Sequence, residues 1–209
     1  LIADAAVDVF GADCARIWMI RPSDRCDDGC PHAFRSDGPD VCRERSRCLH
    51  LVASSGRYTH IDGVHARVPL ACFKIGRIAS GTTPALVIDD VANDPHVHDR
   101  EWARALGLSS FAGYRLVSPE GVCIGVLALF SKRTIAPHEQ RLLEDLAGMA
   151  SHVIEAGAAQ EALQEMESRS RAIALGSPIP QFVIDRNHKV IFWNKPLEAF
   201  TGIAASDVV

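Results

Sequence analysis

The spacing of apolar side chains changes several times along the chain, and the order of these changes predicts a mixed α/β fold. Residues 1–10 place their apolar side chains on one face of a helix, and Gly11 is a suitable helix end. In residues 14–20 both alternating sets contain apolar side chains, which predicts a strand covered on both faces. Residues 49–54 predict a second strand, because an apolar run there is followed by a Ser-Ser-Gly turn.

The middle of the chain predicts short helices and a hairpin. Pro69 stands near the start of a short helix, and residues 85–91 predict an extended segment that ends in a turn. A second short helix is expected at 99–108. Residues 109–117 and 122–130 predict a hairpin, because a Pro-Glu-Gly turn separates them and the second run has the strongest β pattern in the chain.

Residues 136–174 predict one long helix, with Pro137 in its first turn. Apolar positions repeat there at steps of four and three, the spacing of a coiled-coil seam, at Leu142, Leu146, Met149 and Val153. The repeat shifts its register between residues 160 and 166. We interpret the first half as packing on its own domain and the second half as a seam between two copies. The sequence therefore predicts a homodimer through the helix 136–175.

The last segment follows a stop signal for the helix, a Ser-Pro-Ile-Pro run. Two short strands are expected at 181–185 and 189–194, and another helix after them. Too few residues remain there for an independent hydrophobic core. We therefore expect that sequence beyond this chain completes the segment, and that the chain, which begins with Leu, is part of a longer protein.

Composition limits the class of protein. Of the 209 residues, 47% are hydrophobic and 23% are charged, and the net charge is −4. These values are ordinary for a globular domain. The chain has no basic run that would indicate nucleic-acid binding, and no apolar run of the roughly 18 residues that a membrane helix needs. We expect a cytoplasmic protein with no nucleic-acid partner and no membrane segment.

Four of the seven cysteines gather in one polar stretch. Cys26 and Cys30 form a C-x3-C pair, and Cys42 and Cys48 form a C-x5-C pair eleven residues later. The residues between them are mostly turn formers, so this insertion at 25–48 cannot order itself by burying apolar surface. A connection of this length between two strands needs a function or a link that holds it.

Three kinds of link fit these four cysteines. A Zn²⁺ ion prefers thiolates at short spacing, and His32 or His50 could replace one of them. An iron–sulfur cluster takes cysteine ligands as well, disulfides are the third possibility, and unconnected thiols are the remaining alternative. We expect zinc first, because cytosolic proteins seldom keep stable disulfides. The other cysteines are expected to be buried in apolar surroundings: Cys14, Cys72 and Cys123.

Two stretches resemble a known family. They are DPHVHDREWARALGLSSFAGYRLV (94–117) and GVCIGVLALFSKRTIAPHEQRLLEDLA (121–147), and they resemble GAF domains, which are small-molecule-sensing and dimerisation modules. The resemblance covers residues 1–155 and implies an α/β (α+β) fold with a central antiparallel sheet flanked by helices and a long C-terminal signalling helix. Residues 178–202, PIPQFVIDRNHKVIFWNKPLEAFTG, are similar to the opening of a PAS domain.

The resemblance also implies an order of domains and a function. Residues 1–155 would be a GAF-like sensory domain, 156–176 a coiled-coil linker, and 177–209 the first part of a PAS-like domain. This order is similar to the input half of a sensor histidine kinase, a diguanylate cyclase or an enhancer-binding regulator, and we expect the histidine kinase first. The implied function is to bind a small ligand or a metal and to relay that state through the dimeric helix to an output domain in the same chain. This part of the protein would then not be an enzyme.

In GAF domains the pocket lies between the sheet and the short helices, so the resemblance makes candidates of Phe73, Ile75, Trp102, Phe111, Tyr114 and Arg115. Aromatic residues also dominate ordinary cores, which is the competing explanation. His96 and His98 could pair on a metal, although such neighbours more often face solvent. The alternative function is enzymatic: some GAF proteins reduce methionine sulfoxide with loop cysteines, and arginines near Cys42 and Cys48 could activate a thiolate there.

Overall fold

The computed structural model describes residues 2–30, 32–33, 37–38, 40–63, 65–83, 85–94, 97 and 100–209. The chain divides into two compact units, residues 1–155 and 156–209. Within the described ranges, no helix combines the length and the apolar character that crossing a membrane requires.

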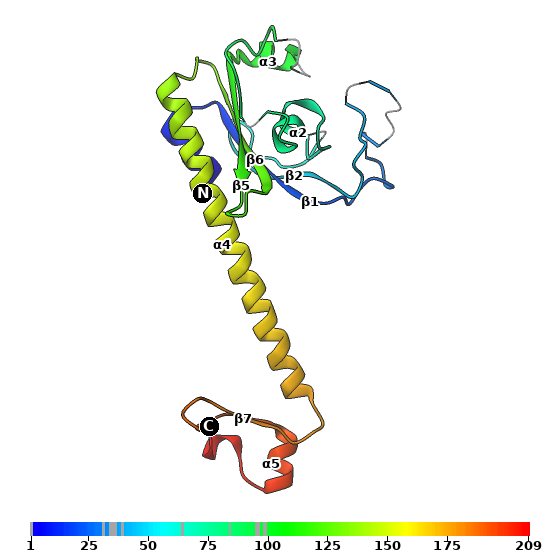
Figure 1. Cartoon of the computed structure of the whole chain (residues 1–209), viewed down its shortest axis with the longest axis vertical. Coiled ribbons are helices and arrows are strands. Elements are labelled where there is room, and N and C mark those ends of the chain that lie inside the picture. The colour runs from blue at the N-terminus through cyan, green and yellow to red at the C-terminus, as the bar shows by residue number, and fades with distance from the viewer. Residues whose placement is uncertain are drawn as a thin grey trace. The chain divides into compact units, whose positions relative to one another are not determined.

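The first unit is built on a six-stranded antiparallel sheet (Figure 1). Its strands lie in the order β3–β2–β1–β6–β5–β4. Their bounds are β1 Cys14–Pro22, β2 Arg47–Gly56, β3 Arg67–Val68, β4 Ala85–Ile88, β5 Ser110–Val117 and β6 Cys123–Ser131. The predicted α/β fold with a central antiparallel sheet is confirmed.

Helices cover both faces of this sheet (Figure 1). On one face, called here the α2 face, lie α2 (Phe73–Ala79) and α3 (Arg100–Leu106). On the other, called the α4 face, lie α1 (Ile2–Phe10) and the first part of α4 (Pro137–Gly176). The long helix predicted from residue 136 onward is therefore present.

The long strands contribute to two cores, because successive side chains point to opposite faces of a sheet. On the α2 face, the strands contribute large side chains to the core: Trp18, Leu51, Phe111 and Phe130. On the α4 face, they contribute Ile17, Tyr114, Leu127 and Leu129 to a core that α1 and α4 complete, largely with alanines. Covering both faces explains why β1 and β6 carry apolar residues at almost every position.

The first part of α4 packs on the sheet through a different stripe from the one that repeats in the sequence. The buried positions are Leu143, Ala147, Ala150 and Ser151. Three expected seam residues, Leu142, Met149 and Val153, are more than half exposed in the single chain. The interpretation that this half packs on its own domain holds, but through small residues that let the helix approach the sheet closely. Leu146, the fourth seam residue, is partly buried against this core, so the uncovered part of the stripe in the single chain is Leu142, Met149 and Val153.

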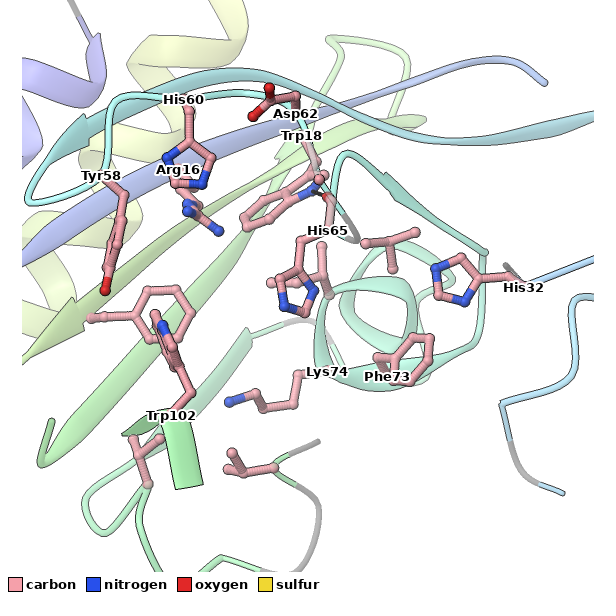
Figure 2. Close-up of a pocket in the computed structure, with 16 residues that line it drawn as sticks. Arg16, Trp18, His32, Tyr58, His60, Asp62, His65, Phe73, Lys74 and Trp102 are labelled. Atoms are coloured by element: carbon pink, nitrogen blue, oxygen red, sulfur yellow. Dashed lines mark hydrogen bonds between the residues drawn. The ribbon is translucent and has the colours of Figure 1, made fainter. Parts of the chain in front are cut away.

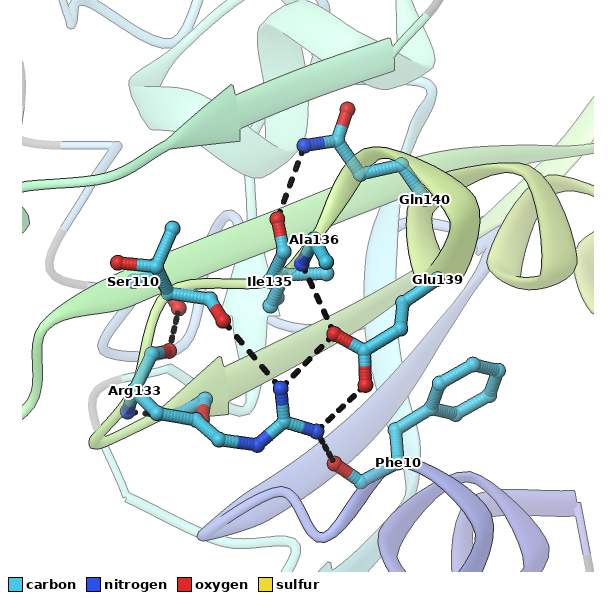
Figure 3. A network of polar contacts seen from close by, with 9 residues as sticks. Phe10, Ser110, Arg133, Ile135, Ala136, Glu139 and Gln140 are labelled. Atoms are coloured by element: carbon cyan, nitrogen blue, oxygen red, sulfur yellow. Dashed lines mark hydrogen bonds and ion pairs between the residues drawn. The ribbon is translucent and has the colours of Figure 1, made fainter.

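A network around Arg133 holds the start of α4 on the α4 face (Figure 3). Its two Nη groups donate to the Glu139 carboxylate at 2.8 and 2.6 Å, and Nη2 also donates to the carbonyl oxygen of Phe10 at 2.7 Å. Glu139 accepts the N–H of Ala136 as well, at 2.8 Å, which satisfies a donor at the helix start. These bonds lower the pKa of Glu139 to about 2, with the hydrogen bond from Arg133 as the largest cause.

The hairpin of β1 and β2 extends further than predicted. β1 reaches Pro22 and β2 begins at Arg47, and Cys48 pairs with Arg21 across the ladder. Cys48 therefore lies in a strand, which corrects its placement in an insertion at 25–48. The connection that leaves the sheet consists of residues 23–46.

The second unit contains the end of α4, a hairpin of β7 (Phe182–Ile184) and β8 (Val190–Trp193), helix α5 (Lys195–Thr201) and the short turn η1 (Ala205–Asp207). Asn194 is fully buried and caps α5: its Oδ1 accepts the N–H of Leu197 at 3.1 Å and of Gln181 at 2.9 Å. The hairpin leaves apolar side chains about half exposed: Phe182, Val183, Ile184 and Ile191. The resemblance of this unit to a PAS domain stays a prediction.

Candidate functional site

A cavity of about 380 Å³ lies on the α2 face of the sheet (Figure 2). This volume falls within the range of small-ligand sites. Its walls come from β1, β3, β6, α2, α3, the connections between β1 and β2 and between β2 and β3, and the segment after β4. The described lining residues are Arg16, Trp18, His32, Tyr58, His60, Asp62, Gly63, His65, Val68, Phe73, Lys74, Ile75, Val91, Val97, Trp102 and Phe130.

The floor of the cavity follows from strand alternation. Arg16 and Trp18 are two residues apart on β1 and reach the same face as Phe130 on β6. The indole N–H of Trp18 donates to the carbonyl oxygen of His65 at 3.0 Å, which ties the β2–β3 connection to the floor. The rings of Trp102 and Phe130 meet edge to face with their centroids 5.6 Å apart. Helix α3 and the sheet thus share one aromatic wall.

The rim of the cavity is polar and open to solvent. His60, Asp62 and His65 are all exposed there. The acidic residue of the lining is therefore a rim residue, whereas Arg16, only 7% exposed, belongs to the interior. Burial lowers the pKa of Arg16 without removing its charge at neutral pH.

The turn before α2 is strained. Ala71 and Phe73 have φ angles of 61° and 52°, in the left-handed region that residues with a Cβ seldom adopt. Asp40, in the insertion, accepts the N–H of Phe73 at 2.7 Å. Gly76 allows the tight return, because a Cβ there would come within 2.1 Å of a backbone oxygen. Strain of this kind gathers at ligand sites, and here it presents Phe73 and Lys74 to the cavity.

Lys74 is held against aromatic rings rather than against an acid. Its Nζ lies 4.3 Å from the centroid of the Phe111 ring and 5.6 Å from that of Phe130. Among the described residues it forms no ion pair. Burial lowers the pKa of Lys74 to about 8, although the charge of Asp94 opposes that shift.

The structure brings half of the predicted pocket residues to the cavity: Phe73, Ile75 and Trp102. The expected placement of the other three is corrected. Phe111 lies on the α2 face but is completely buried beneath Lys74. Tyr114 belongs to the core of the opposite face, because it is an odd number of residues from Phe111 on the same strand. Arg115 lies beside the turn that follows α2. Ligand binding by any of the six stays a prediction.

Sequence reasoning missed the positively charged lining. Arg16 stands in a strand that was expected to be covered on both faces, and Lys74 stands between two predicted pocket residues, Phe73 and Ile75. A charged residue at such a position has to be buried with its charge. A charged residue at a position predicted to be buried was therefore the sequence signal that could have identified Arg16 and Lys74 as site residues.

The cysteines of the insertion lie close to α2. Cys30 and Cys42 are buried, and Cys26 is partly buried. Cys72, expected as a small residue buried in apolar surroundings, donates through its Sγ to the carbonyl oxygen of Val41 at 3.3 Å. Burial raises the pKa of the Cys42 thiol to about 11, and the charges of Cys26, Cys72 and Cys30 add to that shift. Cys72 is therefore a neighbour of the predicted cluster.

No group of three or more His, Cys, Asp or Glu residues is arranged to hold a metal ion in the part of the chain that the structure describes. All seven cysteines are free. The thiols of Cys26 and Cys42 donate instead to the carbonyl oxygens of Arg45 and Glu44, at 3.8 and 3.3 Å. Zinc or an iron–sulfur cluster at Cys26, Cys30, Cys42 and Cys48 stays a prediction. The other predicted metal pair, His96 and His98, lies outside the described residues.

A family model and several known proteins are similar to this chain. The family model of the GAF domain matches residues 1–154, which include the sheet and the cavity. The methyl sulfide methyltransferase-associated sensor of Methanosarcina acetivorans is 31% identical over 98 residues, or 46% of this chain. The chain spans only 10% of the length of that relative.

Two solved structures are similar at a TM-score of 0.50. The GAF domain region of a putative membrane protein from Geobacter sulfurreducens PCA has 19% identity, and the match covers 72% of this chain and 85% of that chain. The GAF domain of an Acinetobacter phosphoenolpyruvate-protein phosphotransferase has 15% identity, with 75% and 78% covered. At such identities the likeness concerns the fold alone.

Proposed function

This chain belongs to the GAF domain family, and we propose that it is the sensory input module of a longer signalling protein, with a cavity that binds a small ligand. The relative from Methanosarcina acetivorans is named as a sensor, which supports a signalling role. In this proposal the output domain follows in the same chain and is a histidine kinase, and the module itself senses without catalysing a reaction.

The cavity carries this proposal. It has the volume of a ligand site, and its rim opens to solvent at the β2–β3 connection. Its interior combines aromatic walls with the charged ends of Arg16 and Lys74 (Figure 2). Interiors are normally close-packed with apolar groups, so a cavity lined in this way is not explained by folding alone.

Calorimetric titration of the chain with three planar probes, 2-naphthol, 2-naphthamide and 2-naphthoate, tests the binding proposal. At least one probe is expected to bind. The variant Val68→Phe fills the cavity from a buried lining position and is expected to lose that binding. Val122→Phe adds the same ring at an exposed position outside the lining and is the matched control. If no probe binds, or if Val68→Phe binds as well as the control, the cavity is not the ligand site.

We propose that the signal leaves through α4 in a homodimer. Within the described residues the helix carries large apolar side chains that are about half exposed or more: Leu142, Met149, Val153, Leu163, Met166 and Ile173. A second copy of the same helix would bury them along a common seam. The shift in the repeat between residues 160 and 166 is a place where two packings can be close in energy, so that a ligand can change their populations.

Photo-crosslinking tests this relay without using the seven natural cysteines. A benzophenone side chain at Leu163 or Met166 is expected to crosslink two copies, and the yields at the two positions are expected to change when a cavity probe is bound. The same group at Glu161 is the control for an exposed helical position. Equal yields with and without the probe would contradict the relay.

We propose that the cysteines of the insertion and of β2 hold zinc, at Cys26, Cys30, Cys42 and Cys48, or, in second place, an iron–sulfur cluster. The charges of Cys26 and Cys30 contribute to the raised pKa of Cys42, so the three sulfurs are close to one another. This proximity supports a shared site. Metal content by plasma mass spectrometry, with a visible spectrum of protein purified without oxygen, is the test. One zinc and no colour supports zinc, and iron with sulfide absorption supports a cluster. A metal-free protein excludes both.

The thiol-enzyme alternative has less support. A catalytic cysteine acts as an accessible thiolate in an electropositive setting. Cys30, Cys42 and Cys48 are buried, and Cys42 donates its hydrogen bond to a carbonyl oxygen. We therefore favour sensing over methionine sulfoxide reduction.

A further inference from the structure

Two positive side chains enter the cavity from different elements. Arg16 comes from β1 and Lys74 from α2, and both project into the space that Trp102 borders (Figure 2). A cation removed from water costs free energy unless a negative group or strong acceptors meet it. The contacts of these two cations therefore show whether the protein itself supplies the negative charge that they require.

Arg16 is positioned but not neutralised. Its Nε donates to Ser54 Oγ at 3.3 Å, and its guanidinium lies 5.7 Å from the centroid of the Tyr58 ring. Ser54 is fixed in turn, because its hydroxyl donates to the carbonyl oxygen of Tyr58 at 2.5 Å. Within the described ranges no carboxylate pairs with Arg16. The side chain is thus held in one orientation, with its fork of Nη donors available to a ligand.

The acidic side chains near the cavity do not supply the missing charge. Asp62 is exposed at the rim. The charge of Asp94 opposes the lowering of the Lys74 pKa, but burial outweighs it. Phe111 and Phe130 stabilise the Lys74 ammonium through their ring faces but leave its charge in place. The interior remains positive.

The apolar part of the lining describes the rest of the ligand. Trp18, Trp102 and Phe130 present flat rings, and Trp102 also stacks at a tilt near Tyr58, with centroids 6.0 Å apart. Such walls pack best against another flat ring. We propose, building on the proposed ligand-binding role of this cavity, that its ligand is a planar aromatic carboxylate whose charge is met by Lys74 and Arg16 and whose ring packs against Trp102 and Phe130.

Titration calorimetry with a matched pair of probes tests the ligand class. 2-Naphthoate and 2-naphthamide have the same ring and nearly the same shape, and differ in charge. The wild-type chain is expected to bind the acid about tenfold more tightly than the amide, as one charge-assisted hydrogen bond would give. Lys74→Met and Lys74→Gln are expected to lose this preference while still binding the amide. Lys132→Met removes a positive charge outside the cavity lining and is expected to keep the preference.

Adipate, an acid without a ring, completes the design. It is expected to bind more weakly than 2-naphthoate, because it cannot pack against the aromatic walls. If the amide binds as tightly as the acid, or the preference survives both Lys74 variants, the carboxylate assignment is overturned while the cavity remains a ligand site. If adipate binds more tightly than 2-naphthoate, the aromatic assignment is overturned. If neither the acid, the amide nor 2-naphthol binds, the proposed function fails together with this inference.

Discussion

The two faces of the sheet differ in how a positive side chain is compensated. On the α4 face, Arg133 is met by both oxygens of Glu139 and by the carbonyl oxygen of Phe10 (Figure 3). On the α2 face, Lys74 lies over the rings of Phe111 and Phe130 and has no carboxylate partner among the described residues. The first arrangement holds a helix on its domain. The second leaves a buried positive charge without a negative partner among the described residues.

This difference separates a structural cation from one that is available for binding. A paired charge at the edge of a core contributes modestly to stability, whereas an unpaired buried charge reduces it. A protein keeps such a charge when something outside the chain compensates it. Under the function proposed above, the α4 face serves folding and signal output, and the α2 face holds the ligand.

Removing the unpaired charge should give the largest effect. The pKa of Lys74 is lowered to about 8 in the folded protein, so between pH 8 and the ordinary lysine value the unfolded chain holds a proton that the folded chain has released. Lys74 should therefore contribute a gain in stability of about 3 kcal/mol at most as the pH rises through this window, against the opposite contribution of buried thiols such as Cys42, whose pKa is raised. Lys74→Met should lack that gain. Urea unfolding at pH 7 and pH 10 measures it.

Lys132→Met is the control for this pH dependence, because Lys132 is half-exposed and paired with Asp13 at 3.4 Å. It should show the same gain as the wild type between pH 7 and pH 10. If the free energy of unfolding changed equally with pH in the wild type and in Lys74→Met, Lys74 would not be a desolvated charge. The contrast between the two faces would then disappear.

Breaking the paired cation should have a smaller effect with the opposite sign. Glu139→Gln removes the charge that Arg133 meets but keeps an acceptor for the N–H of Ala136. The variant should lose about 1–2 kcal/mol at pH 7, less than the full pKa shift implies, because half-exposed Arg133 is screened by water.

The pKa of Glu139 is lowered to about 2. Its contribution is therefore complete above the ordinary glutamate value and is lost as the pH falls towards 2. Urea unfolding of both proteins between pH 6 and pH 2.5 should show their stabilities converging. A constant difference across this range would assign the loss to packing rather than to the ion pair.

A third change affects the link between the insertion and the cavity. Asp40 accepts the N–H of Phe73 within the strained turn, so Asp40→Ala should destabilise that turn by about 1 kcal/mol. Hydrogen exchange should become faster at the Phe73 amide, and 2-naphthoate should bind less tightly because Lys74 follows directly. Asp37→Ala, at an exposed position of the same insertion, is the control. If both variants exchange alike, the insertion does not support the cavity.

The sequence was sufficient for the elements and insufficient for the site. Alternation in β1 and β6 and the long helical run predicted the sheet and α4, because these patterns report burial directly. Alternation also places Arg16 and Trp18 on one face, but it does not say which face carries the cavity. Tyr114 shows the limit: an aromatic residue next to a pocket segment is as suitable for the core behind it, and only the register of β5 decides.

Contacts between segments that are distant in the chain could not be predicted from the sequence. Cys72 lies 30 residues after Cys42, and nothing in its apolar surroundings indicated that it neighbours the insertion. The strained conformation of Phe73 depends on an acceptor 33 positions earlier, Asp40. Local propensity cannot predict such a residue, since it would favour an ordinary φ there. Functional sites are the expected place for this kind of disagreement.

The smallest change in folding stability is expected on the outer side of α4. Val153 is 62% exposed, so Val153→Glu should alter the stability of the first unit by less than about 0.5 kcal/mol. The same change should abolish a dimer that buries the Leu142–Met149–Val153 stripe, because it places two like charges in an apolar seam. His152→Glu, roughly 100° around the helix, is the control and should leave the dimer intact. Urea unfolding measures the stability of Val153→Glu, and sedimentation velocity measures the oligomeric state of both variants. A dimeric Val153→Glu protein, or a monomeric wild type, would contradict a seam through this stripe, and the α4 face would then lose its assignment to signal output while the cavity on the α2 face kept its own.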